Sequence, residues 1–501
     1  MTSNETVATT VVHGNRRNLY LITLSVSIAF MALGVSSAWP TPVLPKFKNN
    51  ETNVVINEDQ VGTMLSLYPV GFAVGSLATR YIADIFGRRA TILCSAIPIV
   101  IGSVIVAFTL QGWLLYITAL TWNCGTGMMS TVIGYYVSEI ADKDVRASLQ
   151  VITSFTFKFG NLITMILGPF LSYEDLNYIM VALPIIYFVV CWWIPETPYF
   201  FLKAGNVEGA KKSLRILRRY KDEKVLDDEL RSLQADVQNE MIHSSSIKEL
   251  LSGPQYRKAI IIALGLKMAQ IMTGGVLIRQ YLGWIVGETK LDMKMSLVLI
   301  IYGCVTFVVA MMSSVLVDRV GRRSLLIYSF YGTGVALGLI GLYFFLQDVM
   351  NTGSAILTTF GFVPLVCIIL SNIISTLGFN SLIHIVPAEI FPLNVKAVAM
   401  TSLNIFGALM AFIVGQGYPK VKAACGLTTI FFIFAAFSIV GGVFSYYFVI
   451  ETKGKKLRDI QIELQGNMYN AVEMVENVET VVIDEDNKNG TEQKELKSSN
   501  T

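Results

Sequence analysis

The chain has 501 residues, of which 53% are hydrophobic and 15% are charged, and its mean hydropathy is +0.56. A soluble protein of this size carries less apolar sequence, so the composition excludes that class and indicates a membrane protein with several spans. The net charge of +3 is almost neutral, and Lys and Arg cluster in loops where membrane topology already accounts for them. We therefore expect a lipid bilayer as a partner and no nucleic acid.

Motifs for catalysis, cofactor binding or metal binding are absent from the sequence, which shows no nucleophile elbow and no phosphate loop. We therefore expect no enzyme activity, no cofactor and no metal site. The cysteines all lie in apolar runs without C-x-x-C spacing, which predicts buried packing residues rather than disulfides. These cysteines are Cys94, Cys124, Cys191, Cys304, Cys367 and Cys425.

Twelve apolar runs, bounded by charges, Pro and Gly, are each near the roughly 20 residues that a helix needs to cross a bilayer. They begin near Leu19, Val61, Ala90, Gly112, Ala147, Asn177, Ala259, Met295, Ser324, Ile356, Ala397 and Gly426. The loop between the third and fourth runs is expected to be a residue or two around Gln111. Because no alternating strand pattern is visible, the sequence predicts an all-α membrane protein.

A long polar interval divides these runs into two sets of six, and no run inside it could cross a bilayer. The predicted parts are a cytoplasmic tail (1–18), a six-helix bundle (19–194), a linker (195–258), a second six-helix bundle (259–449) and a tail (450–501) that is largely disordered after about residue 465. Two or three amphipathic linker helices are predicted from apolar residues at helical spacing. These are Val207, Ala210, Leu214 and Leu217, then Leu226, Leu230, Leu233, Val237 and Met241. A flexible charged linker is the alternative.

Positive residues near the ends of the runs predict the orientation. They gather before the first run and after the second, fourth, eighth and twelfth, so both termini and the linker are expected to be cytoplasmic, in a protein of the plasma membrane. Asn-x-Ser/Thr sequons occur at Asn4, Asn50 and Asn489. Since only Asn50 would lie outside, it alone is expected to carry a glycan.

Three charged signatures occur twice, in the same order, once in each set of runs. Asp84-x-x-Gly87-Arg88-Arg89 recurs as Asp318-x-x-Gly321-Arg322-Arg323, Glu139 with Arg146 recurs as Glu389 with Lys396, and Pro195-Glu196-Thr197 recurs as Ile450-Glu451-Thr452. The similar offsets indicate one duplication. Arg can bridge carboxylates of neighbouring helices, so we expect these charges to form gates that latch the halves in one conformation and part in the other.

Together these signatures resemble the major facilitator superfamily and, within it, the sugar porter family, which includes facilitative glucose transporters and insect trehalose transporters. The most family-specific stretches are Pro195-Glu196-Thr197-Pro198-Tyr199-Phe200 and Glu451-Thr452-Lys453-Gly454-Lys455, and Trp39-Pro40-Thr41-Pro42 looks like the insect branch. The resemblance covers about residues 19–460. It implies two six-helix bundles with alternating access to a central site, the cytoplasmic charges closing the outward-facing state.

The chain departs from the family where solute is expected to bind. The family's Gly and sugar-contacting Gln after Arg146 are Ala147 and Ser154 here, and the seventh run keeps Gln270 but loses the family's second Gln and its Asn. The family's Gly-Pro-x-Pro-Trp is replaced by 380–384 (Asn-Ser-Leu-Ile-His), and its Asn-Trp aligns with 407–408 (Gly-Ala). Because an amide can donate to and accept from adjacent hydroxyls at once, these losses weaken the inference of a sugar.

Other polar residues lie inside the runs. Lys158, Lys267 and Arg279 would suit an anionic or strongly polar solute if they face a cavity, and would otherwise snorkel to the surface. His384 has a packing role or a ligand role. Adjacent glycines after Thr273 should loosen the seventh helix, and the resemblance places Arg279 beside the cavity and Tyr281 at the outer gate. The candidate solute-binding residues are Ser154, Gln270, Thr273, Gly274, Arg279, Gln280, Tyr281, Asn380 and His384.

The first run contains no Asp or Glu, where proton-coupled relatives carry one, which favours a facilitative carrier. We therefore predict facilitative transport of a sugar or a related polar solute by alternating access. The alternatives are a carrier of a non-sugar solute, such as an anionic one, and a non-transporting membrane sensor or receptor. A single copy would suffice for transport, and the sequence leaves the oligomeric state open.

Overall fold

The computed structural model describes residues 17–141, 145–218, 223–242, 247–289, 291, 293–348, 360–455 and 457–465. Most of these residues are helical, and there is no strand among them beyond one isolated bridge. Nine stretches of these residues are long and apolar enough to cross a membrane, and one of them, Val398–Phe448, is long enough for two crossings. Two further helices, 114–140 and 146–167, are as long and pack among these spans.

The described residues of the N-terminal half form six spans, two of which are built from two helices each. Its helices are α1 (Arg17–Ala38), α2 (Pro40–Lys48), α3 (Glu58–Phe86), α4 (Arg88–Cys94), α5 (Ala96–Phe108), α6 (Leu114–Ile140), α7 (Arg146–Leu167) and α8 (Tyr173–Cys191). Helix α3 begins at a capping box between Asn57 and Gln60. It packs closely on α6 because Gly75 has no side chain: a Cβ there would lie 1.9 Å from the carbonyl oxygen of Cys124.

The C-terminal half repeats this arrangement. Its helices are α13 (Arg257–Met272), α14 (Gly275–Gln280), α15 (Leu282–Gly287), α16 (Met295–Arg319), α17 (Arg322–Asp348), α19 (Val363–Leu377), α20 (Phe379–Ile390) and α21 (Leu393–Phe448). Helix α21 contains two spans that meet at Gly426, whose φ of 75° is not helical. The two halves meet where α3 packs on α21 and α7 packs on α16.

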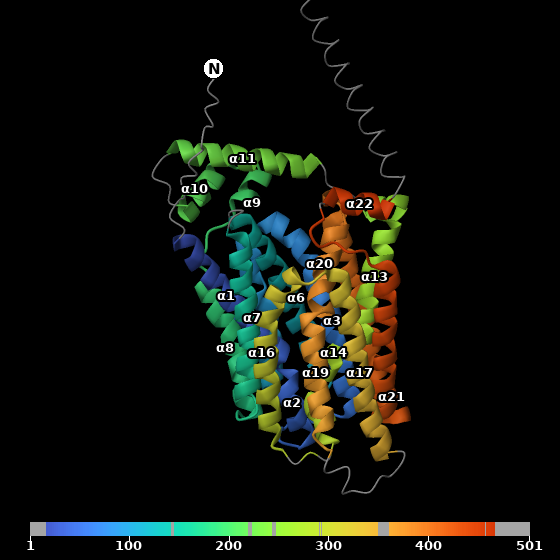
Figure 1. The fold of residues 1–501 in the computed structure, drawn as a ribbon. Coiled ribbons are helices and arrows are strands. Elements are labelled where there is room, and N and C mark those ends of the chain that lie inside the picture. The colour runs from blue at the N-terminus through green and yellow to red at the C-terminus, as the bar shows by residue number, and fades with distance from the viewer. Residues whose placement is uncertain are drawn as a thin grey trace, which may run out of the picture.

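Short helices lie at one end of the bundle, which we call the linker end; the other is the distal end (Figure 1). They are α9 (Pro198–Lys203), α10 (Val207–Arg218), α11 (Glu223–Ile242), α12 (Ile247–Ser252), a 3-10 turn (Pro254–Tyr256) and α22 (Leu457–Gln465). Helices α9, α10 and α11 pack on one another, and α10 also packs on α1, whereas α12 packs on α21. The linker is thus helical and is shared between the halves.

The described residues of the linker form four α-helices, so the prediction of two or three was too low. Helices α9 and α12 have six residues each, too few to show a periodic apolar pattern. Ala210, Leu214 and Leu217 are buried as predicted, but Val207 is 43% exposed because it is the first residue of α10. Met241 lies in α11, and its side chain is outside the described part of the chain.

Most predicted spans begin within four residues of the helices observed, and Met295 begins α16. Several helices begin earlier than predicted because charged residues such as Arg17, Arg88 and Arg322 form their first turn. The loop near Gln111 runs over 109–113 and is longer than predicted. The predicted start at Ile356 lies outside the described residues, as do Asn4, Asn489 and the tail after residue 465.

All the cysteines are free, as predicted, but only two of the six are buried. Cys94, Cys304 and Cys425 are exposed in this structure. The prediction of buried packing was therefore wrong for these three. An apolar run gives no sign of which helix face a residue occupies when the surrounding solvent is itself apolar lipid.

Candidate functional site

The seventh span is broken at Gly274, as the adjacent glycines predicted. Gly274 has a φ of 68°, in the left-handed region, and separates α13 from α14. A Cβ at this position would lie 2.2 Å from the ring of Phe434, so both the backbone and the space require glycine. Thr273 is buried and its hydroxyl donates to the carbonyl oxygen of Gln270 at 2.6 Å. Beyond the break, α14 carries Arg279, which lines a cavity.

Two of the predicted binding residues contact each other. The Gln270 side-chain amide on α13 donates to Asn380 Oδ1 on α20 at 3.0 Å. His384, one turn beyond Asn380, is exposed although it lies inside a span. It interacts electrostatically with the positive charge of Lys267 on α13. These polar residues of α13 and α20 form a cluster within the C-terminal half that can exchange hydrogen bonds with a hydroxylated solute.

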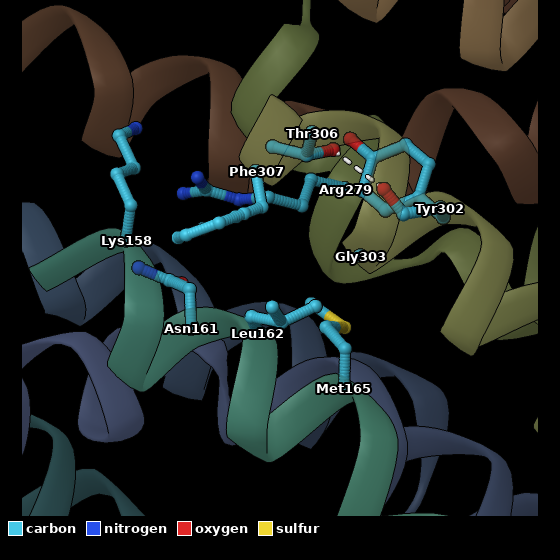
Figure 2. Close-up of a pocket in the computed structure, with 9 residues that line it drawn as sticks. All are labelled: Lys158, Asn161, Leu162, Met165, Arg279, Tyr302, Gly303, Thr306 and Phe307. Carbon is cyan, nitrogen blue, oxygen red and sulfur yellow. Dashed lines mark hydrogen bonds between the residues drawn. The ribbon is translucent and has the colours of Figure 1, made fainter. Parts of the chain in front are cut away.

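A cavity lies between the two halves and is lined by α7 on one side and by α14 and α16 on the other. Its lining residues are Lys158, Asn161, Leu162, Met165, Arg279, Tyr302, Gly303, Thr306 and Phe307. The Arg279 side chain extends toward α7, which carries Lys158 and Asn161 one turn apart (Figure 2). The cavity has about 20 Å³ of room, enough for a water molecule but not for a sugar. A larger solute would require the halves to separate further.

Sequence reasoning identified Arg279 and, as a charge inside a span, Lys158, but it missed other cavity residues. Asn161 lies one turn after Lys158 on α7 and hydrogen-bonds with Ser37 at 3.1 Å. Thr306 accepts from the Asn372 amide at 2.7 Å. The helical spacing of Lys158 and Asn161 could have revealed the first of these, whereas nothing in the sequence pairs α7 with α16. Ser154, one turn before Lys158, is exposed.

The halves are joined tightly at the distal end. Trp284 of α15 donates to the carbonyl oxygen of Leu44 at 2.7 Å, and Lys48 pairs with Glu288 at 2.7 Å. Tyr281 is 2% exposed and stacks on Tyr418 with 4.5 Å between ring centres. Gln280, next to it, is also buried. We call this set of contacts between α2, α15 and the surrounding spans the distal seal.

The predicted gate charges of the N-terminal half form one cluster at the linker end. The Arg88 side chain donates to Glu139 at 2.9 Å and to Asp84 at 3.2 Å, and the backbone N–H groups of Arg88 and Arg89 bind the Glu196 carboxylate at 2.9 and 3.0 Å. Thr197 donates to Glu139 at 2.5 Å, Lys203 pairs with Asp84 at 2.8 Å and Arg89 donates to the carbonyl oxygen of Trp192. The cluster ties α3, α4, α6 and the loop after α8 together.

The C-terminal half repeats most of these contacts. Arg322 pairs with Glu389 at 3.3 Å, and the backbone N–H groups of Arg322 and Arg323 bind Glu451 at 2.8 and 3.1 Å. Thr452 donates to Glu389 at 2.5 Å, as Thr197 does to Glu139. The duplicated signatures thus form the same network twice, and each of these contacts stays within its own half.

Two predicted gate residues form no such contact among the residues that the structure describes. Arg146 is exposed and forms no ion pair with Glu139, and Lys396 forms none with Glu389, among the residues described. In the sequence, Glu139 is followed by Arg146 and Glu389 by Lys396 within the same signature. In the structure, the two carboxylates bind Arg88 and Arg322 of the first signature instead. The side chain of Asp318 is outside the described part of the chain.

The two copies of the carboxylate that binds the backbone differ in acidity. Burial raises the pKa of Glu196 by more than the backbone N–H groups of Thr197, Arg89 and Arg88 lower it. Burial also raises the pKa of Glu451, but backbone N–H groups, with Lys453 foremost, outweigh it and hold the pKa below its usual value. Glu196 is therefore the weaker acid and takes up a proton first as the pH falls.

Comparison with known proteins relates this fold to one family. A family model described as sugar (and other) transporter matches residues 15–464. The facilitated trehalose transporter Tret1 of Bombyx mori is 26% identical over 445 residues, covering 89% of this chain and 86% of that protein. The protein of the same name from Polypedilum vanderplanki is 28% identical over 456 residues, covering 89% of this chain and 88% of its own.

Among solved structures, the inward open conformation of the xylose transporter XylE from E. coli is similar with a TM-score of 0.72 and 18% sequence identity, covering 88% of this chain and 99% of that chain. A partially occluded inward open conformation of XylE gives a TM-score of 0.70. The fold is therefore the major facilitator fold, twelve transmembrane helices in two six-helix bundles. The chain belongs to the family of sugar (and other) transporters.

Proposed function

We propose that this protein is a facilitative carrier that moves a sugar or a related polar solute across the plasma membrane by alternating access. The observation that carries the proposal is the arrangement of its contacts. The halves are joined at the distal seal, a cavity lined by both halves lies between them, and the charge clusters at the linker end each stay within one half. Such a molecule can close at one end and open at the other.

The proposed moving units are residues 19–194 and 259–449, connected by the linker 195–258. The polar cluster of Gln270 and Asn380 supports a hydroxylated solute, because paired amides suit adjacent hydroxyl groups. The names of the relatives, which are trehalose transporters, support a sugar. The absence of Asp and Glu from α1 supports transport without proton coupling.

Uptake by the purified protein in liposomes tests this proposal. With labelled glucose and trehalose, uptake should reach equilibrium without concentrating the solute, and a pH gradient should not change it. Gln270→Ala should raise the KM about 2- to 10-fold, since one neutral hydrogen bond contributes about 0.5–1.5 kcal/mol. Gln111→Ala, in the loop before α6, is the matched control. Accumulation that collapses with a protonophore would contradict facilitative transport.

Glycosylation tests the orientation, with the linker end and both termini in the cytoplasm. Asn50 is exposed at the end of α2, on the distal side. Asn50→Gln should abolish the mass shift that a glycosidase produces, whereas changes at Asn4 or Asn489 should have no effect. Loss of the mass shift when Asn4 or Asn489 is replaced would contradict the proposed orientation.

A further inference from the structure

Lys158 and Arg279 face one cavity from opposite halves. We propose that this pair binds the acidic group of the solute, so that the carrier takes a small hydroxylated organic anion, such as a sugar acid, in preference to a neutral sugar. This inference rests on the proposed carrier function and names the chemical class of its solute.

Lys158 cannot place its charge at the membrane surface. It lies 12 residues after the first residue of α7, Arg146, and 9 before the last, Leu167. At about 1.5 Å per residue these distances are about 18 and 13 Å, longer than a lysine side chain. Both Lys158 and Arg279 line the cavity rather than the lipid-facing surface. Snorkelling therefore does not explain Lys158.

No carboxylate neutralises this pair among the residues that the structure describes. The charged group that acts on Lys158 is Arg279, another cation, and the Lys158 ammonium lies 5.5 Å from the ring of Phe157. Carboxylates at the ends of the bundle have other partners: Glu139 pairs with Arg88, Glu58 with Lys422 and Glu288 with Lys48. Like charges that share a poorly hydrated site repel each other, and an anion bound between them would offset this electrostatic repulsion.

The neutral groups around the pair keep some capacity for hydroxyl groups. Asn161 accepts from Ser37 and donates one amide proton to the Phe157 carbonyl oxygen, which leaves its second amide proton. The Thr306 hydroxyl donates to the Tyr302 carbonyl oxygen and accepts from Asn372, which leaves it as an acceptor only. One cation comes from α7 and the other from α14, so a bound anion would attract both halves toward itself. Lys267, on α13 one turn before Gln270, adds a third cation, with no ion pair among the described residues. Cations from both halves therefore make the interior favourable for a negatively charged solute.

A pair of solutes that differ at one carbon tests the inference. D-glucuronate carries a carboxylate where D-glucose carries a CH₂OH group. Wild-type protein in liposomes should take up glucuronate with the higher kcat/KM. Lys158→Gln and Arg279→Gln should each lower this value about 10-fold or more, since a hydrogen bond to a charged group is the stronger kind, and should lower the value for glucuronate more than the value for glucose. Lys158→Arg, which keeps the charge, should retain glucuronate uptake.

The membrane potential supplies a second readout. At equilibrium, a transported monoanion is about 50-fold less concentrated inside a liposome whose interior is 100 mV negative, whereas the distribution of a neutral sugar does not depend on the potential.

Melting of the protein without solute separates a binding role from a structural one. Removing an unpaired cation should leave the melting temperature unchanged or raise it, whereas removing one member of a structural ion pair would lower it.

The outcomes separate the two proposals. Uptake of glucose with no uptake of glucuronate would overturn the anion inference and leave the carrier function standing. Uptake of neither solute, with no shift in melting by either, would overturn both. Equal loss of glucose and glucuronate uptake in the Gln variants, with lowered melting temperatures, would assign the pair a structural role and overturn the inference.

Discussion

Arg88→Ala is expected to destabilise the protein by about 3–5 kcal/mol, the cost of removing one member of a buried ion pair. The Arg88 side chain is 5% exposed and its partner Glu139 is 11% exposed, so the carboxylate would be left buried without its cation. The loss should appear as a lower melting temperature in detergent, followed by tryptophan fluorescence.

Two other substitutions calibrate that result. Arg322→Ala breaks the equivalent pair, whose side chains are more exposed, at 13% and 27%, and it should cost less. Arg146→Ala removes an exposed arginine that has no ion pair among the described residues and should cost less than about 0.5 kcal/mol. If Arg88→Ala and Arg146→Ala melt at the same temperature, the N-terminal cluster does not stabilise the fold.

Charge reversal at Arg88 or Arg322 should also raise cysteine accessibility from the linker end if the clusters form the predicted gate.

Gly283→Leu is expected to prevent the distal seal from closing and so to abolish most transport. A Cβ at this position would lie 2.3 Å from Cγ of Pro45, across the contact between α15 and α2. Because a side chain cannot fit, the protein should shift to conformations in which the two halves are apart at this end. A cysteine placed near Tyr281 should then react with a reagent added from the distal side.

Gly287→Leu is the matched control, since it lies on the same short helix and a Cβ there meets nothing within 4 Å. It should leave both uptake and labelling close to wild type. Normal uptake by Gly283→Leu at wild-type surface levels would show that the contact between Gly283 and Pro45 is not needed for the transport cycle.

The general fold could be predicted because the bilayer imposes simple requirements on the sequence. Runs of about 20 apolar residues reveal helices without any knowledge of their partners, and the repeated signatures at Arg88 and Arg322 reveal the duplication. The break at Gly274 was also predictable, since adjacent glycines disfavour a continuous helix. These features are all local in sequence.

The parts that could not be predicted depend on contacts between distant residues. Glu139 binds Arg88 and Thr197 rather than Arg146. A sequence repeat does not show which of its charged residues form ion pairs with one another. The cavity around Lys158 depends on α7 meeting α16, and no pattern within either segment shows which other helix it contacts. For the same reason the exposed cysteines were not recognised.

The packing of the linker helices determines where the two halves of the chain actually part. Helices α9, α10 and α11 belong with the N-terminal half, and Asn18 of α1 donates to the carbonyl oxygen of Ile216 on α10. Helix α12 belongs with α21 in the other half. A gene split between α11 and α12 would therefore encode two fragments that each keep a whole half with its own linker helices, and these fragments could be expressed separately and reassembled.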